Sequence, residues 1–308
     1  MALRQVLEVY ELLDSATIDG PQVAAFLHAH GVESVEVERI TSGERFTDAV
    51  RIRMPGSDPR APVLGVIGKL GGVGARPAQI GIVSDADGAL VTLALALKLG
   101  AMRKAGDQLP GDVIISTHIC PAAPTRPHHP VPFMSIPVER EKLERADVHP
   151  DMGAVLSIDT SRGNRVVNHK GIAITPTVRQ GWILPVASDL IDILETVTAV
   201  HAVVMPLSTQ DITPYANGLF HVNSILQPAA YTDVPVVGVA ITAQVAVPGC
   251  ATGATQLDDV DKAVRFSLEV AKAWGRGACR FHDEAEFARL VGLYGSMARL
   301  QTAGTTGA

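Results

Sequence analysis

Two aspartates that stand two residues apart, directly before a glycine, are the first group in this chain with chemical potential. Asp85 and Asp87 lie in the segment Gly81-Ile-Val-Ser-Asp-Ala-Asp-Gly88, where a helical pattern begins. One carboxylate is enough to cap the free backbone N–H groups at the start of a helix. The second leaves a metal or substrate role open, because carboxylate oxygens bind divalent cations. We predict Asp85 as a metal ligand and Asp87 as a catalytic residue.

A histidine and a cysteine form the second candidate group, in the segment Ser116-Thr-His-Ile-Cys-Pro121. His118 and Cys120 follow an apolar strand pattern, and strand side chains two residues apart point to the same side. Imidazole nitrogen and thiolate sulfur are both zinc ligands, although a cysteine in such a place is more often a small buried apolar side chain. We predict His118 as a metal ligand and both residues as catalytic.

An aspartate and a cysteine on later segments complete the candidate metal site. Asp159 ends an apolar strand, where a carboxylate must be paired or metal-bound because bare burial is costly. Arg162 or Arg165 could pair it. Cys250 lies in the turn Pro248-Gly-Cys-Ala-Thr-Gly253, whose glycines allow close approach of a backbone to a ligand. We predict both residues as metal ligands and Cys250 also as catalytic.

Other polar side chains are suited to holding a small substrate. Several cations could bind a carboxylate or a similar anion. A polar stretch, Thr209-Gln-Asp-Ile-Thr-Pro-Tyr-Ala-Asn-Gly218, also follows a strand pattern, where ligands bind in open α/β sheets. The predicted substrate-binding residues are Lys69, Arg76, Arg162, Asp211, Asn217 and His221.

The elements that must position these residues follow from apolar periodicity, which alternates between strand and helix patterns. The expected helices are 2–13, 22–30, 88–104, 187–198, 257–273 and 284–300. The expected strands are 35–40, 46–54, 62–67, 113–116, 154–158, 171–175, 202–205 and 236–241. Such alternation predicts one α/β domain with a mixed sheet over residues 1–300, opened by a helix pair in 1–31 and followed by a flexible tail, 301–308.

Composition narrows the class of protein. The 308 residues are 47% hydrophobic and 19% charged, which is typical of a folded globule. The formal net charge of -6 argues against nucleic-acid binding, and no apolar run is long enough to span a membrane. The N-terminus has no signal-peptide pattern, and three widely spaced cysteines suit a reducing compartment. We therefore expect a cytoplasmic protein that binds a small molecule and forms a homo-oligomer.

The order of elements and loops resembles the zinc aminopeptidase and carboxypeptidase clan, a fold also described as phosphorylase/hydrolase-like, with three layers around a mixed sheet. Ser84-Asp-Ala-Asp-Gly88 is similar to the clan's Asp-x-x-Gly motif, so the resemblance implies Asp85 as the carboxylate that bridges two metal ions and Asp159 as a ligand of the second. The stretches Thr117–Pro124, Thr209–Tyr215 and Pro248–Gly253 resemble a bacterial family known as domain of unknown function 1177.

Three positions depart from the clan's pattern. Lys69 and its neighbours stand where the clan has a His-x-Asp pair, and no glutamate stands near His118, where the clan has two. Only Cys250 is available where the clan has its last histidine. The standard two-zinc site is therefore missing, and peptidase chemistry cannot simply be carried over.

The sequence favours a metal-assisted hydrolase of a small amide, lactam or dipeptide-like substrate. In this hypothesis one divalent ion, with zinc preferred for its nitrogen and sulfur ligands, polarises the carbonyl group and activates water. A second hypothesis is a metal-independent racemase, isomerase or amidase in which Cys120 and Cys250 act as acid and base or nucleophile. A third is a non-catalytic protein of this fold that binds a small ligand.

Overall fold

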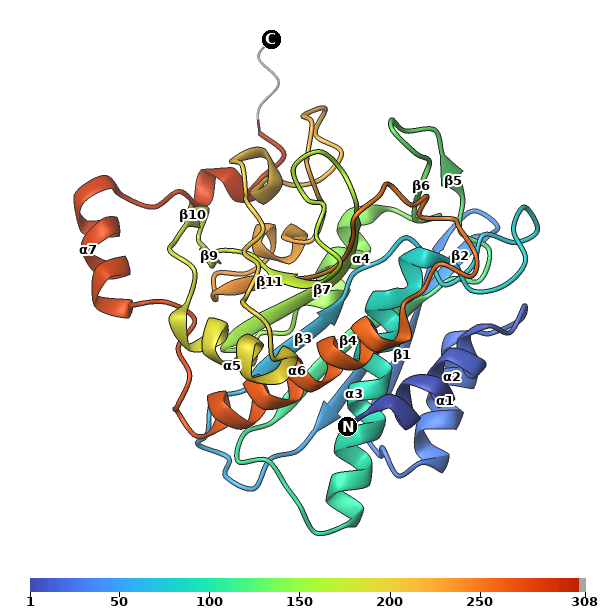
Figure 1. Cartoon of the computed structure of the whole chain (residues 1–308), viewed down its shortest axis with the longest axis horizontal. Coiled ribbons are helices and arrows are strands. Elements are labelled where there is room, and N and C mark those ends of the chain that lie inside the picture. Colours follow the sequence, from blue (N-terminus) through green and yellow to red (C-terminus); the bar gives the residue numbers. More distant parts are fainter. Residues whose placement is uncertain (305–308) are drawn as a thin grey trace.

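A nine-stranded mixed sheet runs through the molecule in the computed structural model, which describes residues 1–304 apart from the side chain of Arg162 (Figure 1). The strand order is β1-β2-β4-β3-β7-β11-β9-β10, and β8 also pairs with β11. The central strands are parallel: β4 (Val113–Ile119), β3 (Leu64–Gly68), β7 (Ala154–Arg162) and β11 (Val236–Ala243). Their carboxyl ends therefore meet at one edge of the sheet.

Antiparallel strands flank this parallel centre. On one side, β2 pairs with β4 and β1 pairs with β2; on the other, β8 and β9 pair with β11 and β10 pairs with β9. The bounds are β1 (Val35–Ser42), β2 (Arg45–Met54), β8 (Gly171–Ile174), β9 (Val178–Arg179) and β10 (Trp182–Ile183). A separate ribbon joins β5 (Thr125–Arg126) and β6 (Phe133–Met134).

Helices cover one face of the sheet, where α1, α3, α5 and α6 lie side by side (Figure 1). Helix α4 packs against β2 and β4. The helices are α1 (Leu3–Leu13), α2 (Gly20–Ala29), α3 (Asp87–Lys104), α4 (Arg140–Asp147), α5 (Ser188–Thr198), α6 (Leu257–Gly275) and α7 (Glu284–Tyr294). Short 3-10 turns are η1 (Ser84–Ala86), η2 (Gln210–Ile212), η3 (Gln227–Ala230) and η4 (Ala298–Gln301). None of the described helices has the length and apolar character to cross a membrane.

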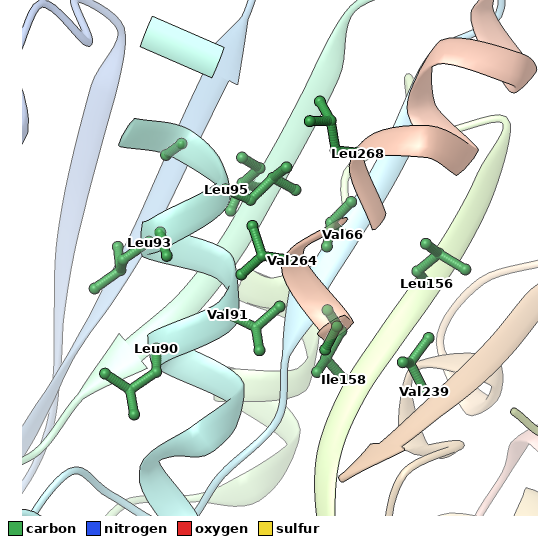
Figure 2. Close-up of a cluster of buried hydrophobic side chains, with 14 of the residues drawn as sticks. Val66, Leu90, Val91, Leu93, Leu95, Leu156, Ile158, Val239, Val264 and Leu268 are labelled. Atoms are coloured by element: carbon green, nitrogen blue, oxygen red, sulfur yellow. The ribbon is translucent and has the colours of Figure 1, made fainter. Parts of the chain in front are cut away.

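The main core lies between the sheet and the helices α3 and α6. Figure 2 shows Val66, Leu156 and Val239 from three neighbouring strands facing Val91 and Val264 from these two helices. Alternate residues of the same strands, such as Ile67 and Val155, join a second apolar cluster on the other face. Strands buried on both faces read as continuous apolar runs, which is the pattern these segments have.

The structure confirms the predicted fold class, an α/β fold with a mixed sheet, and contains most of the predicted helices and strands. Two element predictions are wrong. Residues 202–205 form no strand but a single bridge from Val204 to Ile174, and the last long helix ends at Tyr294 rather than continuing to 300. Gly295, at a φ of 77°, takes the chain out of helical geometry there.

Helix α4 and the start of the tail were not expected in their observed form. The sequence of α4, REKLERAD, has a single strongly apolar residue, so it carries no apolar stripe that would indicate a helix. Gln301 ends η4, and its side-chain amide donates to the carbonyl oxygens of Ala229 and Thr232 at 3.0 and 2.9 Å. Of the predicted tail 301–308, residues 305–308 lie outside the described part of the chain.

Candidate functional site

A cleft of about 200 Å³ opens at the carboxyl ends of β3 and β7, where ligands bind in open α/β sheets. Its walls come from the segments after these strands, from the loop between β5 and β6, and from the polar stretch around η2. The polar side chains that line it include Lys69, Asp85, Arg140, Asp159, Asn164, Tyr215, His221 and Ser224. This volume suits a small molecule.

Asp159 is the most unusual titratable group in the cleft, with a residue exposure of only 6%. Its Oδ1 accepts a hydrogen bond from the backbone N–H of Thr160 at 2.7 Å, and its Oδ2 accepts one from the Ser224 hydroxyl at 3.0 Å. Burial, together with the negative charge of Asp85, raises the pKa of Asp159 to about 8. Asp159 therefore carries a proton at neutral pH in the folded protein.

Asp85 is placed by three segments that are hydrogen-bonded together. Its backbone N–H donates to the carbonyl oxygen of Gly249 at 3.1 Å, and the Thr160 hydroxyl donates to the carbonyl oxygen of Ser84 at 3.1 Å. A Cβ atom at Gly249 would lie 2.9 Å from Asp85 Oδ2, so this glycine leaves room for the carboxylate. The glycine-rich turn that contains Cys250 thus supports Asp85.

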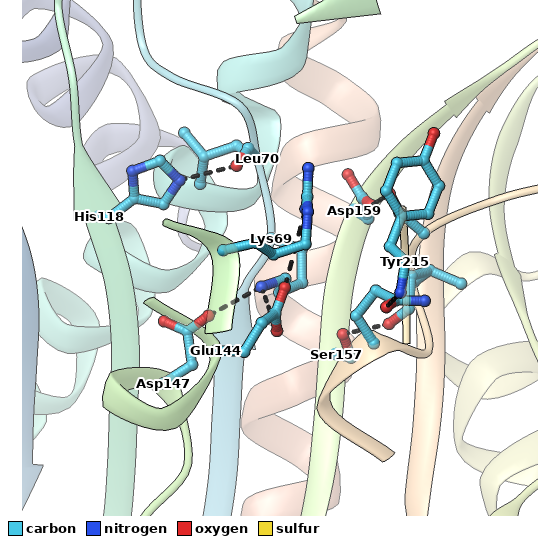
Figure 3. Close-up of polar contacts among 12 residues, drawn as sticks. Lys69, Leu70, His118, Glu144, Asp147, Ser157, Asp159 and Tyr215 are labelled. Carbon is cyan, nitrogen blue, oxygen red and sulfur yellow. Dashed lines mark hydrogen bonds and ion pairs between the residues drawn. The ribbon is translucent and has the colours of Figure 1, made fainter. Parts of the chain in front are cut away.

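Lys69 is a buried cation at the end of β3 (Figure 3). Its Nζ atom lies 2.8 Å from Glu144 Oε2 and 2.8 Å from Asp147 Oδ2, both on α4. Burial alone would lower the pKa of Lys69, but the charges and hydrogen bonds of the two carboxylates outweigh it and raise the pKa. Lys69 is therefore a positively charged residue in the wall of the cleft. Two of its three N–H donors bond to Glu144 and Asp147.

An aromatic and polar wall faces Asp159. Figure 3 shows the Tyr215 ring beside Asp159, and the His221 ring lies 5.0 Å from that of Tyr215, centroid to centroid. His221 Nε2 lies 3.1 Å from the Thr213 hydroxyl oxygen, which also accepts a hydrogen bond from the Asn217 side-chain amide at 2.8 Å. Of these, Tyr215 and His221 line the cleft, whereas Asn217 does not line it and bonds to Thr213.

His118 lies inside β4, is 1% exposed and does not line the cleft. Its Nδ1 atom is 2.7 Å from the Thr47 hydroxyl oxygen and its Nε2 atom is 2.7 Å from the carbonyl oxygen of Leu70. Burial lowers the pKa of His118 to about 4, so the ring is neutral at physiological pH. Both ring nitrogens are hydrogen-bonded to groups of the protein, so His118 has a structural role.

Cys120 and Arg76 line a different hollow, of about 560 Å³, beside Phe46. Cys120 is 2% exposed, and burial raises the pKa of its thiol to about 11. Arg76 donates to the carbonyl oxygen of Asp14 at 2.6 Å, on the N-terminal side of the molecule. Cys250 is half-buried and packs against the apolar cluster that contains Cys120. These side chains lie outside the lining of the cleft at the strand ends.

The remaining predicted site residues have other placements. Asp87 is fully buried as the first residue of α3. Asp211 is also fully buried; its two oxygens accept hydrogen bonds from the backbone N–H groups of Ser208, Val222 and Asn223 and from the Ser208 hydroxyl. It therefore orders the loop around η2. The side chain of Arg162 lies outside what the structure describes.

The predicted metal ligands come together only in part. Asp85 and Asp159 line the cleft, whereas His118 and Cys250 do not. Within residues 1–304, no group of three or more His, Cys, Asp or Glu side chains is arranged to hold a metal ion. A catalytic zinc ion takes three protein ligands, so the described side chains do not fit the predicted zinc centre.

Sequence reasoning missed the residues that α4 brings to the site. Arg140, Glu144 and Asp147 are spaced by four and three positions, so they share one face of the helix. The signal available was a run of strong helix formers after Glu139. Ser224, which binds Asp159, lies in a loop segment with no pattern that would have indicated this contact.

Comparison with protein families gives a match to the model described as "Protein of unknown function (DUF1177)" over residues 38–304. The chain belongs to this family. A search of curated proteins found no match. The family resemblance expected from the motifs is thereby confirmed, and it supplies no reaction.

Solved structures share the fold of this DUF1177 protein. The bottromycin maturation enzyme BotP matches with a TM-score of 0.52 and 16% identity, over 90% of this chain and 70% of that one. BotP in complex with Mn gives 0.50 and 14%, over 89% and 71%. Caenorhabditis elegans leucine aminopeptidase LAP1 gives 0.52 and 11%, over 91% and 66%. The expected peptidase-like fold is confirmed, and at these identities the likeness concerns the fold alone.

Proposed function

We propose that this DUF1177 protein is a hydrolase that cleaves a C–N bond in a small amide, lactam or dipeptide-like molecule, with Asp85 and Asp159 as an acid–base pair. One observation carries the proposal: two carboxyl groups from different segments line one small cleft, and one of them is buried and protonated at neutral pH. Titratable groups whose environments differ in this way commonly supply the acid and the base of a reaction.

In the proposed reaction, a water molecule attacks the amide carbonyl carbon and gives a proton to the Asp85 carboxylate. Asp159 donates its proton to the departing nitrogen, the C–N bond breaks, and a carboxylic acid and an amine result. A proton then passes from Asp85 to Asp159 and restores the starting state. The Ser224 hydroxyl and the Thr160 N–H hold the Asp159 carboxyl group in place during these transfers.

The two-cysteine alternative has less support from the site. Cys120 lies outside the cleft lining, and a thiol with a pKa of about 11 is almost entirely protonated at neutral pH. Because the thiolate is the reactive species, such a cysteine is a poor nucleophile or base. The non-catalytic alternative, a protein that only binds a small ligand, gives the protonated Asp159 no role. The experiment below distinguishes this alternative from a hydrolase.

The test is a hydrolysis screen of dipeptides, N-acyl amino acids and lactams, read by mass spectrometry, with the wild type and Asp159→Asn. We expect the wild type to turn over at least one compound and Asp159→Asn to be slower by about 100-fold or more. Asp233→Asn, an exposed carboxylate outside the cleft, is the matched control and should keep wild-type activity.

Three results would contradict the proposal. If Asp159→Asn kept wild-type activity, Asp159 would not be the acid of the reaction. Activity that EDTA abolishes and a divalent metal restores would replace the acid–base pair by metal-assisted hydrolysis, the hypothesis that the sequence favoured. A compound that stabilises the protein thermally without being turned over, with no substrate found, would favour the ligand-binding alternative.

A further inference from the structure

Arg140, the first residue of α4, is an arginine in the cleft wall whose guanidinium makes no hydrogen bond to the described residues. Its guanidinium carbon lies 4.8 Å from the centroid of the Tyr215 ring, and its Nη1 atom lies 3.9 Å from Glu144 Oε1. The side chain is 25% exposed and lines the cleft. The aromatic ring and the carboxylate therefore hold the guanidinium in one place at the cleft surface.

The other half-buried arginines whose side chains the structure describes are hydrogen-bonded. Arg265 bonds to Asp261 and to the carbonyl oxygen of Val197, at 2.9 and 2.8 Å, and Arg53 bonds to Asp112 and Asp151. By contrast, no acceptor among the described residues lies within hydrogen-bonding distance of the Arg140 guanidinium, and the Tyr215 hydroxyl likewise has no described partner. Arg140 and Tyr215 thus bring five N–H donors and one hydroxyl to the cleft, and none of these groups is bonded to an acceptor in the described part of the chain.

Glu144 makes its close contact with Lys69 rather than with Arg140, since the two distances are 2.8 and 3.9 Å. The buried acids Glu144 and Asp147 both bond to Lys69. The 3.9 Å contact between Arg140 and Glu144 is longer than a hydrogen bond, so the N–H groups of Arg140 remain available to a bound anion.

We propose that Arg140 and the Tyr215 hydroxyl bind a free carboxylate of the substrate, so that the substrate class is a small amide that carries a carboxylate. This inference rests on the proposed function for the identity of the amide. The planar guanidinium matches a carboxylate with two parallel hydrogen bonds, and the stacked tyrosine ring limits its rotation. Arg140 lines the same cleft as Asp85 and Asp159, so a bound carboxylate would fix the amide near the acid–base pair.

The test is isothermal titration calorimetry with N-acetylglycine and, as the uncharged probe, N-acetylglycinamide. Because the proposed acid–base pair would cleave the amide of these probes, the reference protein and every variant below carry Asp159→Asn, and the reference is wild type at all other positions. We expect the reference protein to bind N-acetylglycine and to bind the amide form at least tenfold more weakly. Arg140→Gln should weaken binding of N-acetylglycine by about tenfold or more, and Tyr215→Phe by a few-fold. Arg140→Lys, which keeps the charge but loses the fork, should fall between Arg140→Gln and the reference protein.

Arg145→Gln is the matched control, because Arg145 lies on the same helix, pairs with Glu141 and does not line the cleft. It should bind N-acetylglycine like the reference protein. Three results would each overturn the inference. Arg140→Gln could bind N-acetylglycine as tightly as the reference protein does, the reference protein could bind the two probes equally, or the reference protein could fail to bind N-acetylglycine. Because Asp159→Asn removes the proposed acid from every protein in this test, the result does not depend on the acid–base pair, and the two proposals fail separately.

Discussion

Gly88 faces the backbone of Lys69 so closely that a Cβ atom on Gly88 would lie 2.6 Å from the Lys69 carbonyl oxygen. The same Cβ would lie 2.9 Å from the carbonyl oxygen of Ile158. Gly88 is near the start of α3, Lys69 directly follows β3, and Ile158 lies in the middle of β7, next to Asp159. This contact lets the start of the helix pack against both strands and brings Asp85 to the same cleft as Asp159.

Gly88→Ala should destabilise the protein by about 1–3 kcal/mol, because both clashing atoms belong to buried backbone that cannot rotate away. Urea unfolding measures the change. Gly292→Ala is the control, since it adds a Cβ within α7 where no heavy atom lies within 4 Å. It should be neutral or stabilising by up to about 1 kcal/mol. Equal stability of Gly88→Ala and the wild type would contradict the close approach.

Lys69→Met should cost about 3–5 kcal/mol, because it leaves Glu144 and Asp147 buried without their shared cation. Urea unfolding again provides the measurement. Lys142→Met is the control, as Lys142 is on the same helix as the two acids and its side chain is 62% exposed. Adding Glu144→Gln and Asp147→Asn to Lys69→Met should recover part of the loss. If Lys69→Met were as stable as the wild type, Lys69 would not be paired with Glu144 and Asp147 in the folded protein.

Asp159 should make the protein less stable as the pH rises. The pKa of Asp159 is about 8 in the folded protein and 3.8 ordinarily, so between these values the folded state holds a proton that the unfolded state has lost. Stability is then lost with increasing pH, by at most about 1.4 kcal/mol per pH unit. We expect Asp159→Asn to remove this part of the slope in urea unfolding from pH 4 to 8, and Asp233→Asn to keep it. If the free energy of unfolding of the wild type and of Asp159→Asn changed with pH in parallel, Asp159 would not hold a proton in the folded protein.

His118 should act in the opposite direction over a lower pH range. Its pKa is about 4 in the folded protein and 6.5 ordinarily, so the unfolded state binds the extra proton between these values. Stability is lost as the pH falls from 6.5 to 4, by up to about 1.4 kcal/mol per unit. His118→Asn should lose this dependence in urea unfolding, whereas the exposed His201→Asn should retain it. An unchanged slope in His118→Asn would mean that the ring is charged when folded.

The sequence by itself predicted the α/β fold and four residues that line the cleft: Lys69, Asp85, Asp159 and His221. Apolar runs with strand and helix periods report which faces are buried, and this information is local. Asp85 and Asp159 could be placed together because Asp85 lies in the segment that follows β3, and Asp159 lies in the carboxyl-terminal half of the neighbouring parallel strand β7.

Only the tertiary structure decided which polar groups satisfy one another. His118 was predicted as a ligand from its residue type, but Thr47 and Leu70, 71 and 48 positions away, engage its two nitrogens. Lys69 meets Glu144 across 75 positions, on a helix whose polar sequence shows no apolar stripe. Hydrogen bonds and ion pairs depend on atoms within about 3 Å, and long-range packing sets those distances. The local pattern therefore predicts the edge of the sheet at which the site lies, and packing selects the side chains that face the cleft.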